Sequence, residues 1–405
     1  MNAEVKSGYK QTEVGLIPED WFVTSLGNSF GKITTGKLDA NAMSENGEYP
    51  FFTCAKEVYR INHYAFDCDA LLISGNGANV GYVHHYNGKF NAYQRTYVLT
   101  EAKHDIHYLK VYVEVNLQER LRVEVNAGNT PYIVKSTLSD MPIGLPKSSI
   151  EQQRIAFTLA DIDALISSLD HLISKKRDIQ QATMQQLLTG QRRLPGFSGE
   201  WEVKRLGEIG EISGAGVDKK IRTEETEVKL LNYTDVYKKD FLRSSDFSHV
   251  VTAKPEQISR CGIKKCDVFF TPTSETRDDI GHAAVSCEDM PGIVYSYHVV
   301  RLRPTMELNT EFLGFVFKSK AFKDQASTLC EGSGTRYVIT LPKFRAMNIF
   351  LPSDVSEQAA IGGILFEMSR ELLALEARRD KARMLKQGMM QELLTGRIRL
   401  TNQGI

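Results

Sequence analysis

Two long segments of the chain carry apolar residues at alternating spacings of three and four. The apolar positions are Ile155, Leu159, Ile162, Ile166, Leu169 and Ile173 in the first segment, and Ile361, Leu365, Met368, Leu372 and Leu375 in the second. This spacing gathers the apolar side chains on one stripe of an α-helix and is typical of a heptad seam. We therefore predict two long helices, at about residues 150–190 and 356–396.

Start and stop signals flank both predicted helices. Pro146 and Pro352 precede them, and Gly190 and Gly396 lie where a left-handed C-terminal cap belongs. A helix of about 40 residues forms a rod about 60 Å long, and such a rod cannot bury an apolar stripe on itself. Each helix therefore needs a partner, and we predict that the two pair as an antiparallel coiled coil.

The two helical segments belong to an internal repeat. A shift of 206 positions aligns Gly128–Leu194 with Gly334–Leu400 without a gap, and 22 of these 67 positions are identical. The repeat also reaches the start of each half, where Trp21, Val23, Leu26 and Gly27 return as Trp201, Val203, Leu206 and Gly207. A period of this length indicates a duplication. With antiparallel helices, the halves would be related by a pseudo-two-fold axis.

Between each opening segment and its helix, the pattern predicts a globular α+β region. Strands are expected at 71–73, 81–83, 96–99, 268–270, 293–295 and 298–300, and helices at 107–119 and 310–326. The segment 195–199, rich in proline and glycine, separates the halves. We predict a first globule at 1–145, a helical region at 146–195, a second globule at 196–350 and a second helical region at 351–405.

Composition narrows the class of protein. A length of 405 residues favours two or three domains, and the formal net charge of zero argues against binding to nucleic acid by charge alone. The six cysteines show no disulfide spacing, which favours free thiols in the cytoplasm. The sequence has neither a signal-peptide pattern at its start nor an apolar run of membrane-spanning length, so no membrane association is expected.

Motifs of several enzyme classes are missing from the sequence. It contains no Pro-Pro dipeptide, as an adenine methyltransferase motif would need, and no Gly-x4-Gly-Lys-Ser/Thr loop. The glycines at 75, 77 and 81 lack dinucleotide-binding spacing, and we interpret them as a tight turn between strands. No Cys/His set has structural-zinc spacing, so neither metal nor cofactor is expected. A Ser/His/Asp triad stays open, although no Gly-x-Ser-x-Gly elbow marks one.

Several of these segments resemble a known family. They are the opening from Tyr9 to Trp21, the strand 69–73 with the glycine-rich stretch 75–81, the Leu-Pro and Glu-Gln helix starts, and the Leu-Leu-Thr-Gly helix ends. Over essentially the whole chain, the sequence resembles specificity subunits of type I restriction-modification systems.

The resemblance implies a non-catalytic subunit with two target recognition domains and two spacing helices. Such a subunit reads a bipartite asymmetric sequence in double-stranded DNA. It also binds two methylation subunits, onto which restriction subunits assemble. Equivalent major grooves recur about every 34 Å on one face of DNA, so helices of fixed length would fix the spacer in the recognised site.

Candidate DNA-binding residues in the first globule cluster around the glycine-rich turn. Asn side chains suit an adenine edge, arginine suits guanine, and hydroxyl, amide and basic groups suit phosphates. The candidates are Asn76, Asn79, Tyr82, His84, His85, Lys89, Gln94 and Arg95, with Thr130 and Tyr132 just before the helical region. The alternative is that they are core tyrosines or solvated loop residues.

The second globule offers polar residues at corresponding places. Thr273, Ser274, Thr276 and Arg277 follow a predicted strand, and Ser333, Thr335, Arg336 and Tyr337 precede the second helix. Hydroxyl groups again suit phosphate contacts, and Arg277 is the best base-reading candidate. The glycines before the second group could instead mark an ordinary turn.

The apolar seams weaken around Lys176 and Lys386, where basic residues recur at equivalent positions. These are Lys175, Arg177, Lys381 and Arg383, which we predict to dock a partner protein. The alternative is a solvated section of helix. For the whole chain, the rival hypotheses are a coiled-coil adaptor that never binds DNA and an enzyme whose active site lacks a recognisable motif.

Overall fold

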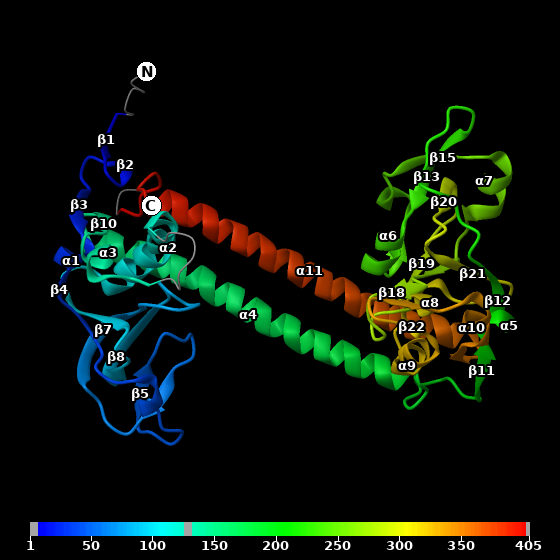
Figure 1. The fold of residues 1–405 in the computed structure, drawn as a ribbon, viewed down its shortest axis with the longest axis horizontal. Helices are drawn as coiled ribbons and strands as arrows, with labels where there is room; N and C mark the ends of the chain where they lie inside the picture. The colour runs from blue at the N-terminus through cyan, green and yellow to red at the C-terminus, as the bar shows by residue number, and fades with distance from the viewer. Residues whose placement is uncertain (1–6, 125–131, 402–405) are drawn as a thin grey trace. The chain divides into compact units, whose positions relative to one another are not determined.

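The computed structural model describes residues 7–124 and 132–401. Contacts divide the chain into two compact units (Figure 1). Unit 1 consists of Met1–Asp170 and Arg378–Ile405, and unit 2 consists of His171–Ala377. Each unit therefore combines one globule with part of both long helices.

The two long helices are α4 (Ser149–Leu187) and α11 (Val355–Leu393), each 39 residues long. They confirm the predicted long helices, although both end slightly earlier than predicted. Gly190 and Gly396 follow the helix ends with φ of +68° and +67°, the left-handed caps expected from sequence. No helix in the described ranges is both long and apolar enough to cross a lipid bilayer.

Unit 1 is built around a six-stranded sheet with the order β4-β9-β7-β8-β5-β6. Its strands are β4 (Phe30–Thr35), β5 (Tyr49–Phe52), β6 (Tyr59–Ile61), β7 (Phe66–Ser74), β8 (Val83–Ala92) and β9 (Thr96–Ala102). Two further pairs are β1 (Tyr9–Thr12) with β2 (Gly15–Pro18), and β3 (Phe22–Ser25) with β10 (Pro142–Leu145). Besides the long helices, the helical segments of unit 1 are α1 (Leu26–Ser29), η1 (Ala40–Ala42), α2 (Ile106–Glu124) and α3 (Lys135–Ser139).

Both faces of this sheet are buried, because successive side chains of a strand point to opposite faces. Leu71 and Leu99 pack on one face against Tyr108 of α2, in a core that also holds Ile155 of α4 and Leu393 of α11. The residues next along the strands form a smaller core on the other face, made of Phe52, Ala70, Leu72, Phe90, Ala92 and Val98. The ends of both long helices are thus part of the main core of unit 1.

Unit 2 contains several smaller sheets. They are β12-β21-β17-β19-β14, β15-β13-β20-β16, β18-β23-β22 and the pair β11-β24. The strands are β11 (Trp201–Arg205), β12 (Gly210–Ser213), β13 (Thr226–Leu231), β14 (Phe241–Leu242), β15 (Val250–Ala253), β16 (Gly262–Ile263), β17 (Val268–Phe270), β18 (Thr273–Ser274), β19 (Ala283–Ser286), β20 (Met290–Tyr295), β21 (Val300–Pro304), β22 (Glu331–Ser333), β23 (Arg336–Val338) and β24 (Asn348–Pro352). The helical segments are α5 (Leu206–Ile209), α6 (Tyr233–Lys238), η2 (Ser244–Asp246), α7 (Pro255–Cys261), α8 (Thr310–Val316), α9 (Lys320–Leu329) and α10 (Leu341–Ala346).

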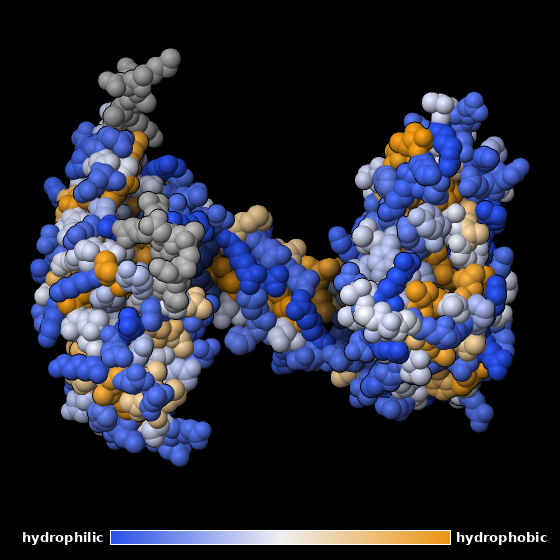
Figure 2. Space-filling model, in the orientation of Figure 1, coloured by the Kyte–Doolittle hydropathy of each residue, from blue (hydrophilic) through white to orange (hydrophobic). Residues whose placement is uncertain are grey.

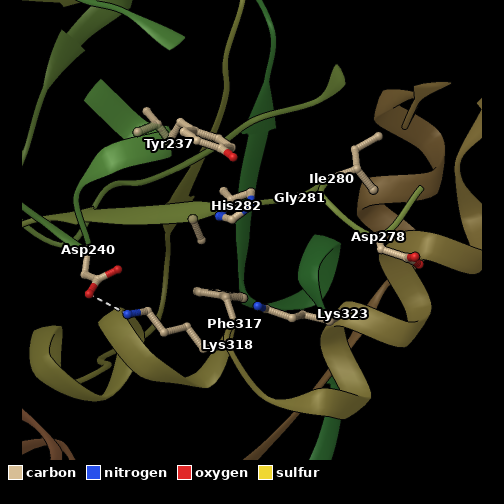
Figure 3. A pocket seen from close by; sticks show the side chains of 11 residues that line it. Tyr237, Asp240, Asp278, Ile280, Gly281, His282, Phe317, Lys318 and Lys323 are labelled. Atoms are coloured by element: carbon tan, nitrogen blue, oxygen red, sulfur yellow. Dashed lines mark ion pairs between the residues drawn. The ribbon is translucent and has the colours of Figure 1, made fainter. Parts of the chain in front are cut away.

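The main core of unit 2 lies between the β12-β21-β17-β19-β14 sheet and helices α8 to α10. Phe270, Phe312 and Phe344 are fully buried there, together with Leu187 of α4 and Leu365 of α11. A second core lies under the β15-β13-β20-β16 sheet. On the surface of this unit, a cavity of about 260 Å³ is lined by residues from α6, β19 and α9 (Figure 3).

Most predicted strands of the globules are confirmed. The runs 71–73, 96–99, 268–270 and 293–295 lie in β7, β9, β17 and β20, and the helix predicted at 107–119 lies in α2. In two runs only the last residue is in a strand, because β8 begins at Val83 and β21 at Val300. The helical segment predicted at 310–326 is confirmed over most of its length, but it is divided into α8 and α9. The Ser319 side chain marks the start of α9 by accepting a hydrogen bond from the Phe322 amide.

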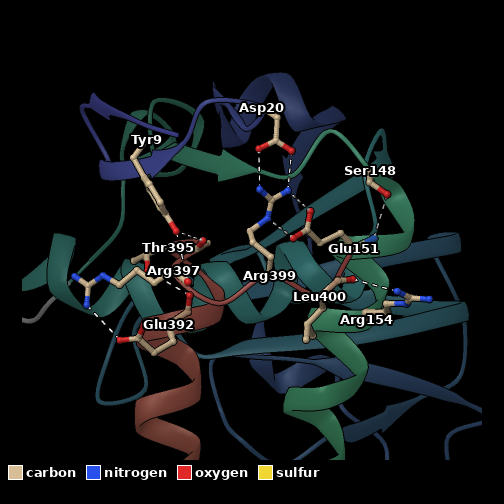
Figure 4. A network of polar contacts seen from close by, with 11 residues as sticks. Tyr9, Asp20, Ser148, Glu151, Arg154, Glu392, Thr395, Arg397, Arg399 and Leu400 are labelled. Carbon is tan, nitrogen blue, oxygen red and sulfur yellow. Dashed lines mark hydrogen bonds and ion pairs between the residues drawn. The ribbon is translucent and has the colours of Figure 1, made fainter. Parts of the chain in front are cut away.

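A buried ion pair fixes the start of α4 in unit 1 (Figure 4). Glu151 is 1 % exposed in its side chain and accepts two hydrogen bonds from Arg399, at 2.7 and 2.9 Å. Arg399 also binds both carboxylate oxygens of Asp20 and lies 5.9 Å from the ring of Trp21. These carboxylates raise the pKa of Arg399, and Arg399 in turn lowers the pKa of Asp20.

Unit 2 repeats the Glu–Arg pair at positions shifted by 206, and its tryptophan is the counterpart of Trp21 in the repeated opening segment. Arg193 binds Glu357 at 2.6 and 2.7 Å and lies 6.0 Å from the ring of Trp201. The glutamine after each glutamate donates to the carbonyl of the proline before its helix, Gln152 to Pro146 and Gln358 to Pro352. The repeated Glu-Gln and Arg-Leu pairs of the sequence are therefore repeats of one set of contacts.

Polar side chains link α4 and α11 within each unit in the same repeated way. Unit 1 has Arg383 paired with Asp170 at 3.0 Å and Lys386 paired with Asp163 at 2.6 Å. Unit 2 has Arg177 paired with Glu376, and Gln180 donating to Ser369 at 2.7 Å. A shift of 206 converts each unit 1 pair into the corresponding unit 2 pair.

Removing Arg399 should destabilise unit 1. Arg399→Ala leaves the Glu151 carboxylate buried without its partner, which should cost about 3 kcal/mol of unfolding free energy. The measurement is urea unfolding followed by Trp21 fluorescence in a Trp201→Phe background, since the chain has two tryptophans. Arg397→Ala is the matched control, because Arg397 pairs with Glu392 at the surface and should cost less than about 1 kcal/mol. Equal losses in both variants would contradict this account.

Candidate nucleic-acid interface

The polar residues predicted in the second globule come together on a small sheet. Strand β18 pairs with β23, placing Thr273 opposite Val338 and Ser274 opposite Tyr337. Strand β22 pairs with the other side of β23 and forms a hairpin whose turn is Gly334-Thr335. Ser333, Thr335 and Arg336 are exposed on this hairpin. The two segments that the sequence marked separately thus form one surface.

This surface borders a cleft of about 660 Å³. The predicted residues in its lining are Thr273, Ser274, Thr276, Thr335 and Arg336. The lining residues that the sequence analysis missed are Tyr233, Thr234, Tyr237, Glu275, Asp279 and His298. Hydroxyl groups, aromatic rings and a cation therefore face one open space, which is the set of groups that phosphates and base edges bind.

The aromatic wall of the cleft is held in place by hydrogen bonds. Tyr233 and Tyr237 stack with ring centroids 6.3 Å apart, and the Tyr233 hydroxyl donates to the Thr273 carbonyl at 2.6 Å. The Tyr237 hydroxyl donates to Asp279 at 2.9 Å, and His282 contacts the other oxygen of Asp279 at 2.7 Å. This hydrogen bond to Asp279 raises the pKa of Tyr237. Both rings are therefore fixed before any ligand binds.

The rim of the cleft carries the cation Arg336 as well as the carboxylates of Glu275 and Asp279. Among the described residues, Arg336 has no hydrogen-bond or ion-pair partner, and it is exposed. Partial burial lowers the pKa of His298, and the nearby charges of Lys219 and Arg336 lower it further. The His298 ring lies 3.9 Å from the ring of Tyr297, measured between centroids, and Tyr297 is 53 % exposed. An anion at this rim would meet an unpaired guanidinium.

Arg277, the expected base reader, has a different environment. Its guanidinium lies 5.0 Å from the ring of Tyr337 and donates to the Ser327 carbonyl at 3.5 Å. It is not among the residues that line the cleft, although it is exposed. The position of Arg277 suits support of the β22–β23 hairpin, and Arg336 is the free cation at the cleft.

The neighbouring cavity of Figure 3 is lined by charges of both signs. Tyr237 lines both spaces, but here Asp240 forms an ion pair with Lys318, and Asp278 faces the space as well as Lys323. Charges of opposite sign therefore compensate each other. Within the described ranges, no group of three or more His, Cys, Asp or Glu residues is placed to hold a metal ion, and the six cysteines are free.

In the first globule, the candidates gather around the loop between β7 and β8. Gly77 and Gly81 have φ of +80° and +79°, which confirms a glycine turn. Gly75 donates to the Arg95 carbonyl at 2.9 Å, and Asn76 forms a β-bridge with Tyr132. Gln94, Arg95 and Tyr132 are exposed, and Tyr132 reaches 60 %. These segments present a polar surface at one end of the sheet.

Other candidates in the first globule already have partners within the fold. Asn79 donates to the Cys54 carbonyl at 3.1 Å, and His84 contacts the Ala55 carbonyl at 3.1 Å. Burial lowers the pKa of His84, which favours the neutral ring. Asn79 and His84 thus support the loop. Tyr82 is 37 % exposed and packs edge-on against the His84 ring.

Two candidates are separated from this surface. His85 follows His84 along β8 and therefore points to the other face of the sheet, where it contacts Asp69 at 2.7 Å and the His107 ring of α2. Lys89 lies 4.8 Å from the Tyr64 ring. Thr130 lies outside the described residues.

The candidate docking residues on the long helices divide into two pairs. Arg177 and Arg383 form the ion pairs between α4 and α11 described above. Lys175 and Lys381 are exposed and, within the described part of the chain, have no ion-pair partner. The lysines are therefore available to a partner, whereas the arginines link the helices.

A family model described as "Type I restriction modification DNA specificity domain" matches the chain twice, at residues 18–175 and 198–382. The chain belongs to this family. Each match takes in one globule and part of the helix that follows it.

Named relatives fit this family. The type I restriction enzyme EcoDI specificity subunit of Escherichia coli is 40 % identical over 176 residues, which is 43 % of this chain and 38 % of that protein. The type I restriction enzyme MjaVIII specificity subunit of Methanocaldococcus jannaschii is 24 % identical over 425 residues, covering 98 % of this chain and 97 % of that protein. The chain thus spans well under half of the first relative and nearly all of the second.

Two solved structures share the fold. The S subunit of a type I restriction-modification system from M. genitalium has a TM-score of 0.62 at 16 % identity, covering 92 % of this chain and 96 % of that chain. A structure from work on assembly and conformational transition of the type I R-M system has a TM-score of 0.52 at 14 % identity, covering 94 % and 99 %. Because the sequence identities are this low, the two solved structures show that the fold is shared and carry no information on function.

The cleft residues that the sequence analysis missed in this specificity-domain protein carry little local signal. Tyr233 and Tyr237 are four apart, a spacing that places both rings on one helix face. This spacing is the sequence pattern that could have marked the two tyrosines. Asp279 and His298 lie in other segments and approach the cleft through the order of strands, which the linear sequence does not display.

Gly332 should be essential for the hairpin that carries Arg336. Its φ is +131°, and a Cβ there would lie 2.1 Å from the Arg336 carbonyl oxygen. Gly332→Ala should therefore destabilise the hairpin by about 2 kcal/mol or more and speed tryptic cleavage after Arg336 at least roughly tenfold. Gly334→Ala is the control, because Gly334 has φ of +69° but no atom near its missing Cβ. Similar cleavage rates in the two variants would refute the close-approach argument.

Proposed function

We propose that the chain is the DNA-recognition subunit of a type I restriction-modification complex, and that each globule reads one half of a bipartite, asymmetric site. The observation that carries the proposal is the double family match, once over each globule. The cleft beside the β22–β23 hairpin supports it, because its hydroxyl groups, aromatic rings and unpaired arginine suit a DNA backbone and base edges. The proposed domain boundaries are those predicted from sequence.

The two globules should read different sequences. Unit 1 presents a glycine-rich loop with Arg95 and Tyr132, and unit 2 presents a hairpin with Thr335 and Arg336. Base-edge recognition depends on which donors and acceptors reach the groove. Two surfaces with different side chains therefore favour an asymmetric site over a palindrome.

We infer that α4 and α11 act as an antiparallel coiled coil that sets the spacer between the half-sites. The polar pairs support opposite directions. In unit 1, the partner of Asp163 is Lys386 and the partner of Asp170 is Arg383, so numbers rise on one helix as they fall on the other. Unit 2 gives the same order with its own pairs. The duplicated contacts also support the internal repeat, because each unit joins the start of one long helix to the end of the other in the same way.

The subunit itself would be non-catalytic, and its helices would dock two methylation subunits that in turn bind restriction subunits. Equivalent exposed residues on the two helices support two copies of one partner. Ile179 and Leu385 are related by the repeat and are 43 % and 56 % exposed, and Lys175 and Lys381 lie one helical turn before them. Figure 2 shows apolar side chains among hydrophilic ones along the helices, as such docking would require.

The test of the proposed function is the pattern of DNA methylation. The chain should be co-expressed with a methylation subunit of a type I system, and methylated adenines should be mapped across the host genome by single-molecule sequencing. We expect a split, asymmetric motif with a fixed gap. A stable complex that methylates no split motif would favour the adaptor hypothesis. Turnover by the purified chain alone would favour the enzyme hypothesis.

Lengthening both helices should change the gap in the motif. Four residues inserted between Asp170 and His171, and four between Ala377 and Arg378, fall where the chain passes between the units. They lengthen each helix by about 6 Å, which corresponds to one or two base pairs of DNA. The expected result is a methylation motif with unchanged half-sites and a longer spacer. An unchanged spacer in an active complex would show that the helices do not set it.

A further inference from the structure

One residue in the unit 2 cleft has the wrong charge for a phosphate contact. Glu275 lines the cleft beside Thr273, Ser274 and Thr276, and it is exposed. Within the described part of the chain, no hydrogen-bond donor or cation pairs with it. A carboxylate is an acceptor only, so it repels phosphate oxygens and can bind only donors. In a DNA-binding cleft this carboxylate can therefore contact the DNA favourably only through a hydrogen-bond donor that the DNA supplies.

The backbone around Glu275 holds it in place. Glu275 follows β18, whose two residues are paired with β23. The next residue, Thr276, donates its amide hydrogen to the Ser274 hydroxyl oxygen at 3.2 Å, closing a tight turn around Glu275. The other carboxylate of the cleft, Asp279, already binds Tyr237 and His282. Glu275 is thus the acidic group of the cleft that is both positioned and uncommitted among the described residues.

The major groove of DNA offers donors of one kind, the exocyclic amino groups of adenine and cytosine. Adenine places its N7 acceptor next to its N6 amino group, so a carboxylate there meets a repulsive lone pair. Cytosine presents its N4 amino group without an adjacent acceptor on the same base. A carboxylate in the groove therefore favours cytosine.

We propose that Glu275 is a specificity-determining residue that accepts a hydrogen bond from the N4 amino group of a cytosine in the half-site read by unit 2. This inference rests on the proposed DNA-recognition function and adds one base to it. Arg336, which lines the same cleft, supplies the cation that offsets the repulsion between Glu275 and nearby phosphates.

The test compares Glu275→Gln with the wild-type chain, each as a complex with the methylation subunit. Binding is measured on duplexes that carry the mapped site, with all four base pairs placed in turn at every position of both half-sites. The wild-type complex should prefer cytosine at one unit 2 position by roughly 10- to 100-fold. Glu275→Gln should remove most of that preference, and because glutamine pairs well with adenine it should shift it towards adenine. All other positions should be unchanged.

Two further variants make the result specific. Glu224→Gln removes an exposed carboxylate that lines a different cleft, and it should change no preference. Glu275→Asp keeps the carboxylate and should keep the cytosine preference with weaker binding. Glu275→Asp also controls for folding. If Glu275→Gln lost all binding while Glu275→Asp kept it, the loss would support the need for the carboxylate.

The outcomes separate this inference from the function on which it rests. A wild-type complex that reads a split site, together with unchanged preferences in Glu275→Gln, would refute the role of Glu275 alone. Equal strengthening of binding to every sequence would also refute it, because it would show that Glu275 only repels the DNA backbone. A wild-type complex without any sequence preference would overturn the proposed function and this inference together.

Discussion

A buried carboxylate at the first turn of each long helix is the constraint on which this structure depends. Glu151 and Glu357 are each 1 % exposed in their side chains. A carboxylate so deeply buried must be paired and hydrogen-bonded, because its desolvation is otherwise too costly. In each unit the partner is an arginine that lies just beyond the end of the other long helix. The beginning of one helix is thereby fixed to the end of the other.

The same contacts connect the helices to the globules. Each arginine lies over a tryptophan from the opening segment of its globule, Trp21 in unit 1 and Trp201 in unit 2. The first apolar residues of one helix and the last of the other belong to the globular core, as Ile155 and Leu393 do in unit 1. Since protein cores are close-packed, a shift of a helix end cannot occur without rearranging the sheet beside it. Each globule therefore forms one rigid unit with the helix ends that pack into its core.

The polar surfaces of the two globules are less constrained by this scaffold. In unit 1, several polar side chains are used to hold the loop itself, since Asn79 and His84 bind carbonyl groups of a neighbouring segment. In unit 2, backbone pairing between β22 and β23 holds the hairpin, which leaves Thr335 and Arg336 free. The duplicated scaffold can therefore carry surfaces with different chemistry, because few of the surface side chains are needed for its stability.

The sequence by itself determined the repeat, the family and the elements governed by local interactions. Helix periodicity depends on residues three or four apart, and a C-terminal cap depends on one glycine, so both long helices and their caps were predictable. Long-range packing decided the rest. The contacts of His84 with the Ala55 carbonyl, of His85 with Asp69 and of Arg277 with Tyr337 all join residues that are distant in sequence. The cleft draws Tyr233, Glu275, His298 and Arg336 from four segments, and only the order of strands brings them together.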